Sequence, residues 1–184
     1  IQAKWEALAK SCERICKNEE DWNFIKRAYF LAKEAHQGVR RRSGEPYFLH
    51  PIAVAQIVVD EIGLGVKSVV ASLLHDVVED TDYTIEDIDN LFGPKVSQIV
   101  DGLTKISGGI FGDRASAQAE NFKKLLLTMS NDIRVILIKI ADRLHNMRTM
   151  DYQTPEKQRL KSLETMQIYA PIAHRLGMQR AKWE

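Results

Sequence analysis

Apolar residues recur every three to four positions along most of this chain, which is the spacing of an amphipathic helix. No segment is convincing as a strand. Together with the Gly, Pro and capping residues, the pattern predicts an all-α chain. The predicted helices cover about 1–16, 21–36 with Asp21 as N-cap, 51–60, 69–80, 84–91, 94–103, 117–130, 132–147, 154–169 and 171–184.

Residues 69–80 carry the strongest chemical signal. An apolar run leads directly into His75 and Asp76, and Glu79 and Asp80 follow at helical spacing, which puts the three carboxylates on one helical face. They come near the predicted C-terminus of this helix, where the helix dipole disfavours anions. A divalent cation held by imidazole and carboxylate is the simplest compensation. A solvated turn before the next helix is the alternative.

The segment 132–147 is apolar on nearly all sides, which predicts a buried helix. Lys139, Asp142, Asn146 and Thr149 nevertheless form a polar stripe at 3-4-3 spacing. Buried polar groups need partners. Asp142 therefore either pairs with a neighbouring basic side chain such as Lys139 or binds a metal.

Residues 38–47 form a predicted loop that is rich in Gly and Arg. The run Arg40–Arg42, next to Ser43 and Tyr47, suits recognition of phosphate oxygens and stacking on a base. A solvated basic loop is the alternative. His50 follows just before a helix start, where its side chain can point inward as a metal ligand or serve as a capping or core residue.

Composition narrows the class of protein. The chain has 184 residues, 45% of them apolar and 28% charged, which is typical of one globular domain over 1–184. Its net charge of +1 gives no support for a nucleic-acid partner. Cys12 and Cys16 lack two further ligands nearby and are interpreted as ordinary thiols. There is no signal peptide or apolar run of membrane-spanning length, so we expect a cytoplasmic protein without a membrane partner.

The ends of the sequence suggest a piece of a longer protein, because it begins at Ile1 rather than Met and stops at Glu184 inside a helical pattern. Residues 107–116 are Gly-rich and predicted to be a mobile loop.

Several motifs occur together in one order: His50-Pro51, His75-Asp76-x-x-Glu79-Asp80, and the segment Ala141–Thr149. This set resembles the hydrolase domain of the RelA/SpoT-homologue family, a branch of the HD metal-dependent phosphohydrolases. The resemblance extends to 43–47 and 172–177 and so covers essentially the whole chain. In long family members the last stretch leads toward an alarmone synthetase domain, which this chain lacks.

The resemblance implies an all-α HD domain of about ten helices around a single divalent metal, usually Mn²⁺. The ligands it implies are His50, His75, Asp76 and Asp142. It further implies hydrolysis of guanosine 3′,5′-bispyrophosphate, (p)ppGpp, to GDP or GTP plus pyrophosphate. Glu79 and Asp80 match the acidic pair that acts on the attacking water, and this intact motif favours an active hydrolase.

The resemblance also implies a nucleotide pocket, with Arg41 stacking on guanine. The matching positions are Arg41, Arg42, Ser43, Tyr47, Lys139, Asn146 and Thr149. Lys139 equally suits a structural counter-charge. Arg42 stands where the family often has Lys, and the 107–116 loop is shorter and less basic than the family leads us to expect.

One further expectation concerns regulation, and two alternative functions stay open. We expect the missing C-terminal synthetase and regulatory regions to control this domain. The alternatives are a broader HD phosphohydrolase acting on other nucleotides, and a regulatory module that binds alarmone without turnover.

Overall fold

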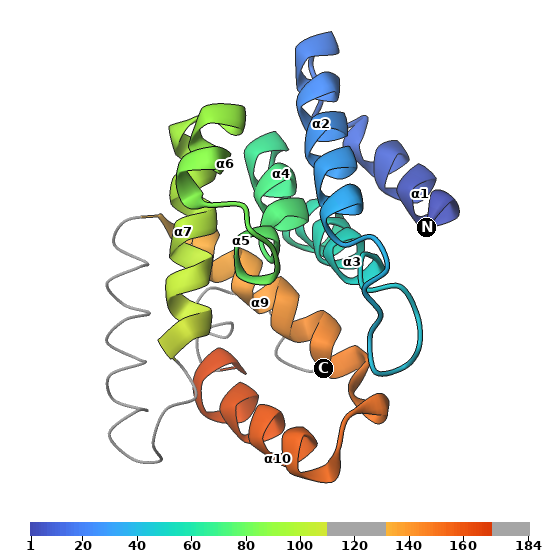
Figure 1. The fold of residues 1–184 in the computed structure, drawn as a ribbon, viewed down its shortest axis with the longest axis vertical. Helices are drawn as coiled ribbons and strands as arrows, with labels where there is room; N and C mark the ends of the chain where they lie inside the picture. The colour runs from blue at the N-terminus through green and yellow to red at the C-terminus, as the bar shows by residue number, and fades with distance from the viewer. Residues whose placement is uncertain (110–131, 171–184) are drawn as a thin grey trace.

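A computed structural model describes residues 1–109 and 132–170, and within them every regular element is a helix (Figure 1). The α-helices are α1 (Gln2–Cys12), α2 (Glu19–Ala35), α3 (Leu49–Ile57), α4 (Val66–Leu74), α5 (Val77–Asp80), α6 (Ile85–Phe92), α7 (Pro94–Gly109), α9 (Ile133–Arg148) and α10 (Pro155–Glu164). Short π-helical turns, Val58–Ile62 and Thr165–Tyr169, extend α3 and α10, and a 3-10 turn, Met150–Tyr152, follows α9. The all-α prediction is therefore confirmed.

Helix α4 lies at the centre of the fold, where it packs against α2, α3 and α7 (Figure 1). All its residues from Ser68 to Leu74 are buried, and the hydroxyl of Ser72 donates to the carbonyl of Ser68 at 2.7 Å. Burial of each large apolar side chain contributes roughly 1.5–3 kcal/mol. The core thus fixes the C-terminal end of α4, from which the site is built.

Helix α9 crosses the molecule diagonally in Figure 1 and packs against α3 and α7. Its contact with α7 is close at Gly102, where an added Cβ would lie only 2.9 Å from Cγ2 of Val135. Glycine at this position lets the two helices approach each other. As predicted, α9 is largely buried, from Val135 to Leu144 except Leu137.

Local signals placed several helix starts correctly. Thr84 and Asp87 form a capping box at the start of α6, and Thr154 caps α10 with Pro155 in the first turn. The predicted N-cap Asp21 is wrong. Asn18 caps α2 instead, because its Oδ1 accepts the Asp21 N–H at 2.9 Å.

Two helix ends also differ from the sequence prediction. Helix α1 ends at Cys12 rather than 16, and α7 continues to Gly109, so residues 107–109 are helical and not loop. The rest of the predicted loop, 110–116, and the predicted helices 117–130 and 171–184 lie outside the described residues. Over the described part of the chain, no helix combines the length and apolar character needed to cross a bilayer.

Candidate metal and nucleotide site

The predicted single helix over 69–80 is wrong, because α4 ends at Leu74 and α5 begins at Val77. The ring of His75 accounts for the break: its Nδ1 lies 2.5 Å from the carbonyl oxygen of Ser72, a group that the helix end would otherwise leave without a partner. Asp76 links the two helices with φ −98° and ψ −6°. The carboxylates of Asp76 and Asp80 consequently reach different partners.

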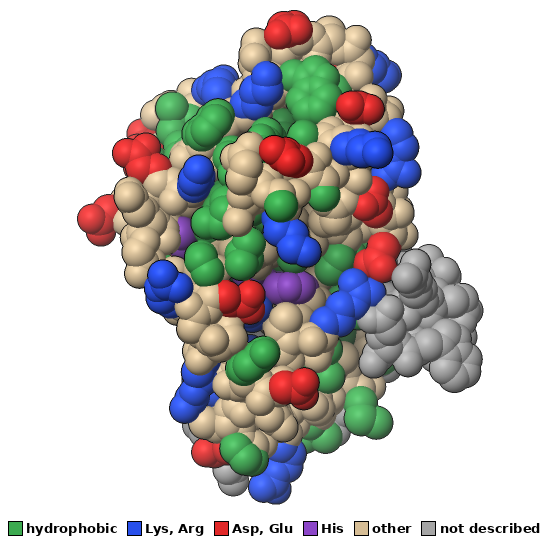
Figure 2. All heavy atoms as spheres, turned by 90° about the vertical axis from the view of Figure 1, so that its right-hand side faces the viewer, with side chains coloured by type: hydrophobic (Ala, Val, Ile, Leu, Met, Phe, Trp, Pro, Cys, Tyr) green, Lys and Arg blue, Asp and Glu red, His purple; other side chains and the backbone are tan. Residues whose placement is uncertain are grey.

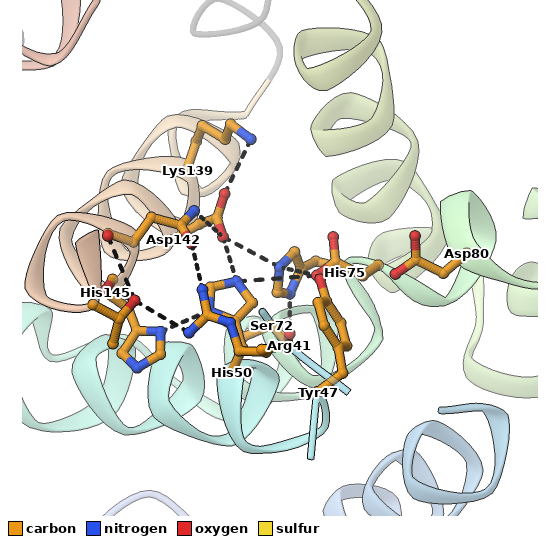
Figure 3. Close-up of polar contacts among 12 residues, drawn as sticks. Arg41, Tyr47, His50, Ser72, His75, Asp80, Lys139, Asp142 and His145 are labelled. Atoms are coloured by element: carbon orange, nitrogen blue, oxygen red, sulfur yellow. Dashed lines mark hydrogen bonds and ion pairs between the residues drawn. The ribbon is translucent and has the colours of Figure 1, made fainter. Parts of the chain in front are cut away.

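Three buried side chains from three helices meet at the centre of the site (Figure 3). His50 comes from α3, His75 from the end of α4 and Asp142 from α9. Nε2 of His50 lies 2.7 Å from Oδ1 of Asp142, and Nε2 of His75 lies 3.5 Å from the same oxygen. One ligand atom from each residue lies within 4.8 Å of the others, a spacing that a single metal ion could bridge.

The fourth predicted ligand, Asp76, borders this group. Its Oδ2 lies 2.9 Å from Nε2 of His75 and 4.0 Å from Nε2 of His50. Two imidazoles and two carboxylates therefore converge, which is a donor set suited to a divalent transition metal.

The orientation of His75 fits such an ion. A carbonyl oxygen can only accept, so the contact with Ser72 puts the ring proton on Nδ1 and leaves the Nε2 lone pair of a neutral ring directed at the carboxylates. Nε2 of His75 is buried, and although it lies close to the carboxylates, its contacts with them do not have the geometry of a hydrogen bond. A cation between this nitrogen and the carboxylates would satisfy all of them.

Without a cation, the charges of the site compensate one another. Burial alone would lower the pKa of His75, but the carboxylates of Asp76 and Asp142 outweigh it and hold this pKa well above the ordinary value. Burial alone would raise the pKa of Asp142, but the charge of Lys139 and the two histidines hold it well below its usual range. Burial alone would likewise raise the pKa of Asp76, but the charge of His75 outweighs it and lowers this pKa.

Lys139 occupies the far side of Asp142. Its Nζ lies 3.0 Å from Oδ2, so Oδ1 remains directed at the two histidines (Figure 3). Burial lowers the pKa of Lys139, but Asp142 and Tyr169 raise it more, and the side chain stays charged. The structure places Lys139 as the counter-charge of Asp142.

Tyr47 reaches the site from the 38–47 loop, and its hydroxyl donates to Oδ2 of Asp76. Burial, followed by the charge of Asp76, raises the pKa of Tyr47. The phenol therefore keeps its proton and holds the carboxylate.

Arg41 ties the same loop to α9. Its guanidinium donates to Oγ1 of Thr149 and to Oδ1 of Asn146, each at 3.1 Å. Three residues predicted to contact the nucleotide are thus brought together. Ser43 instead donates to Glu45 at 3.0 Å within the loop, and Arg42 is exposed.

The predicted acidic pair lies at the margin of the site. Asp80 stands apart from the cluster in Figure 3, and its Oδ2 lies 3.4 Å from Nε2 of His36, a buried residue at the end of α2. Glu79 is exposed. Among the described residues, the ligand atoms that converge are those of His50, His75 and Asp142, and neither member of the acidic pair belongs to this group.

Sequence reasoning missed His145, which lies between the metal cluster and the loop. Its Nδ1 is 2.6 Å from Nδ1 of His50. Burial, the charge of His50 and the charge of Arg41 lower the pKa of His145 to about 3. The signal was available, since His145 follows Asp142 by three residues and shares its helical face.

A cavity of about 650 Å³ opens beside this residue, between α1, α3 and the end of α9. Its lining includes His145, Arg41, Thr149, Lys4 and Ile52. Figure 2 views the side of the molecule that carries α1 and shows a histidine side chain at the surface among basic, acidic and apolar groups.

Comparisons with known proteins agree with this architecture. A family model described as HD domain matches residues 28–179. The chain is 51% identical over 160 residues to a protein of Vibrio cholerae named guanosine-3′,5′-bis(diphosphate) 3′-pyrophosphohydrolase, covering 87% of this chain and 23% of that protein. It is 48% identical over 166 residues to the bifunctional (p)ppGpp synthase/hydrolase SpoT of Escherichia coli, covering 90% of this chain and 24% of that protein.

A solved structure is also similar, with a TM-score of 0.63 and 26% identity over 78% of this chain and 83% of the other. Its description is "A metazoan ortholog of SpoT hydrolyzes ppGpp and plays a role in starvation responses". The chain spans about a quarter of the length of the curated relatives it matches. The resemblance found in the sequence is confirmed.

Proposed function

Because this chain belongs to the HD domain family, we propose that it is a metal-dependent hydrolase that removes the 3′-pyrophosphate of ppGpp or pppGpp. The observation that carries the proposal is the buried group of His50, His75 and Asp142 beside the arginine-bearing loop. The names of its relatives supply the substrate, a guanosine bispyrophosphate. The products are GDP or GTP and pyrophosphate.

The residues that would hold the cation are His50, His75, Asp76 and Asp142. We propose Mn²⁺ as this ion, because it is the metal that the family resemblance implies, and imidazole together with carboxylate oxygens is a donor set compatible with it. The chemistry that such an ion supplies when bound is activation of water and neutralisation of charge on phosphoryl oxygens.

The reaction replaces one P–O bond by another. The water oxygen bonds to the phosphorus that is joined to the ribose 3′-oxygen, the bond from phosphorus to that oxygen breaks, and one water proton ends on the 3′-oxygen. We assign orientation and deprotonation of the water to Glu79 together with Asp80. This assignment requires Asp80 to exchange its contact with His36 for one with the water.

Other side chains bind and orient. Lys139 keeps Asp142 charged, and Tyr47 holds Asp76 in place through its hydroxyl. Arg41 is assigned to stacking on guanine, and Arg42, Ser43, Asn146 and Thr149 are assigned to further contacts with the nucleotide. A guanidinium held by two acceptors is already oriented before the nucleotide arrives.

The biological setting follows the same proposal. We place the reaction in the cytoplasm, where it would lower alarmone levels in the stringent response, in keeping with a related structure described by its role in starvation responses. The curated relatives are longer, and one is named a bifunctional synthase/hydrolase. We expect regions that correspond to this additional length to regulate the domain.

The test is pyrophosphate release from ppGpp with Mn²⁺, with and without EDTA. Chelator-sensitive release, abolished or strongly reduced in Glu79→Gln, is the expected result. GTP and a deoxynucleoside triphosphate serve as competing substrates. A preference for either of these, or undiminished turnover by Glu79→Gln, would contradict the substrate or the assigned chemistry respectively.

A further inference from the structure

The two proposed histidine ligands are supported in different ways. Nδ1 of His75 faces the backbone carbonyl of Ser72, whereas Nδ1 of His50 faces another side chain, the imidazole of His145, at 2.6 Å. We propose that His145 is a positioning residue for His50. In this arrangement Nδ1 of His145 accepts the Nδ1–H of His50, and the contact holds Nε2 of His50 toward Asp142. The inference rests on the proposed metal site and adds a residue to it.

The proton count follows from elementary imidazole chemistry. A neutral ring carries one N–H and one lone pair. If His50 offers its Nε2 lone pair to a cation, its proton must be on Nδ1, 2.6 Å from Nδ1 of His145. Two protons cannot occupy that gap, so Nδ1 of His145 is the acceptor and its own proton is on Nε2. A metal-binding histidine usually donates its other ring N–H to a hydrogen-bond acceptor, most often a carboxylate, a backbone carbonyl or water.

The surroundings hold this arrangement in place. His50 is 3% exposed and its ring lies 4.9 Å from that of His145, centroid to centroid, with 32° between their planes. His145 follows Asp142 by one helical turn on α9. One helix therefore supplies a ligand and also the support for a ligand on α3, so the separation of α3 and α9 fixes both.

A purely space-filling role makes a different prediction from a hydrogen-bonding role. In His145→Asn, the amide oxygen can take the position of Nδ1, because both atoms are bonded to Cγ. In His145→Leu, a methyl group takes that position and no acceptor remains. In His145→Gln, the acceptor is displaced by one methylene.

The experiment is calorimetric titration of the metal-free chain with Mn²⁺, with thermal unfolding of each variant as the control for folding. We expect the Kd for Mn²⁺ to rise about 10–100-fold in His145→Leu. The Kd of His145→Asn should stay within a few-fold of the parent, with His145→Gln between the two. The rate of pyrophosphate release at saturating Mn²⁺ should recover more in the Asn than in the Leu variant.

The outcomes are separable. If the parent binds Mn²⁺ and a folded His145→Leu binds it equally well, His145 only fills space and the inference is overturned while the proposed function stands. If His145→Leu does not fold, equal affinities of the Asn and Gln variants overturn it in the same way. A parent that binds no Mn²⁺ overturns the metal site itself, and the inference with it.

Discussion

Nζ of Lys139 lies 3.0 Å from Oδ2 of Asp142, and both side chains are buried on α9. The lysine neutralises a carboxylate whose other oxygen is directed at two histidines. In the metal-free chain this ion pair is therefore part of what keeps the site folded. Sequence alone left open whether Lys139 contacts the nucleotide or serves as this counter-charge, and the geometry favours the second role.

Replacing the buried lysine by an uncharged residue tests that role. Lys139→Met removes one partner of a buried ion pair, a change that typically costs about 3–5 kcal/mol. We expect urea unfolding of the metal-free chain to show a loss of this size. Saturating Mn²⁺ should raise the unfolding temperature of the variant more than that of the parent, because an added cation restores the missing positive charge.

An exposed ion pair provides the control. Lys105 and Asp101 lie 2.9 Å apart on α7, with 74% and 37% of their side-chain surfaces exposed. Lys105→Met should cost no more than about 1 kcal/mol. Equal losses in the two variants would refute a special role for Lys139.

The guanidinium of Arg41 gives a second prediction. Arg41→Lys keeps the charge but cannot reach Asn146 and Thr149 with a fork of two donors. Hydrogen bonds to charged groups contribute roughly 1.5–3 kcal/mol, and 1.4 kcal/mol corresponds to tenfold in an equilibrium constant. We expect the KM for ppGpp to rise about tenfold or more in initial-rate measurements.

Arg40→Lys is the matched control for this change. Arg40 is exposed and donates to the carbonyl of Gly44 within the loop, at 2.7 Å, rather than to α9. Its KM should remain close to that of the parent. A similar rise in both variants would mean that the loop tolerates no arginine replacement, and would remove the argument for the α9 contact.

Features governed by local chemistry could be predicted from the sequence. The capping box of Thr84 and Asp87 depends only on residues three positions apart, and α9 was identified as buried from its composition. The polar stripe on α9 likewise placed Asp142, Asn146 and Thr149 on one face. These predictions succeed because neighbours along a helix determine them.

Features governed by tertiary contacts could not be predicted in this way. The break at His75 depends on a ring that turns back to the Ser72 carbonyl, and the sequence equally allowed a continuous helix. The pairing of His145 with His50 joins residues 95 positions apart. The contact of Asp80 with His36 has the same origin and was not predicted.

The start of α9 gives a pH-dependent prediction. The guanidinium of Arg134 contacts both carboxylate oxygens of Asp132, at 2.7–3.1 Å, and lowers the pKa of this carboxyl below its usual 3.8. A carboxyl whose pKa is lower in the folded than in the unfolded chain stabilises the folded state at pH values above its unfolded-state pKa. This contribution is lost as the pH falls through the folded-state pKa. Asp132→Asn keeps an N-cap side chain but removes the charge.

We therefore expect the parent to be more stable than Asp132→Asn by about 1 kcal/mol or less at pH 7, since the pair is partly exposed. Urea unfolding at a series of pH values should show this difference shrinking below about pH 4. Arg134→Gln should remove the same pH-dependent contribution. A difference that stays constant between pH 7 and pH 3 would contradict the ion pair as its source.

The contact between α7 and α9 yields the last prediction, at Gly102. Alanine is the better helix former by about 1 kcal/mol, but its Cβ would lie 2.9 and 3.1 Å from the two Cγ atoms of Val135. Valine is stiff about χ1 and cannot rotate away cheaply, so overpacking of about 1–3 kcal/mol should exceed the gain. Gly102→Ala should therefore lower the free energy of unfolding.

In the background of Val135→Ala the same change should become neutral or stabilising, and a cycle of the four proteins in urea measures the coupling. Additive effects would show that the helices separate freely. Strong coupling would mean that this contact fixes α9, which carries Asp142, and Mn²⁺ affinity should then fall in Gly102→Ala and recover in the double variant.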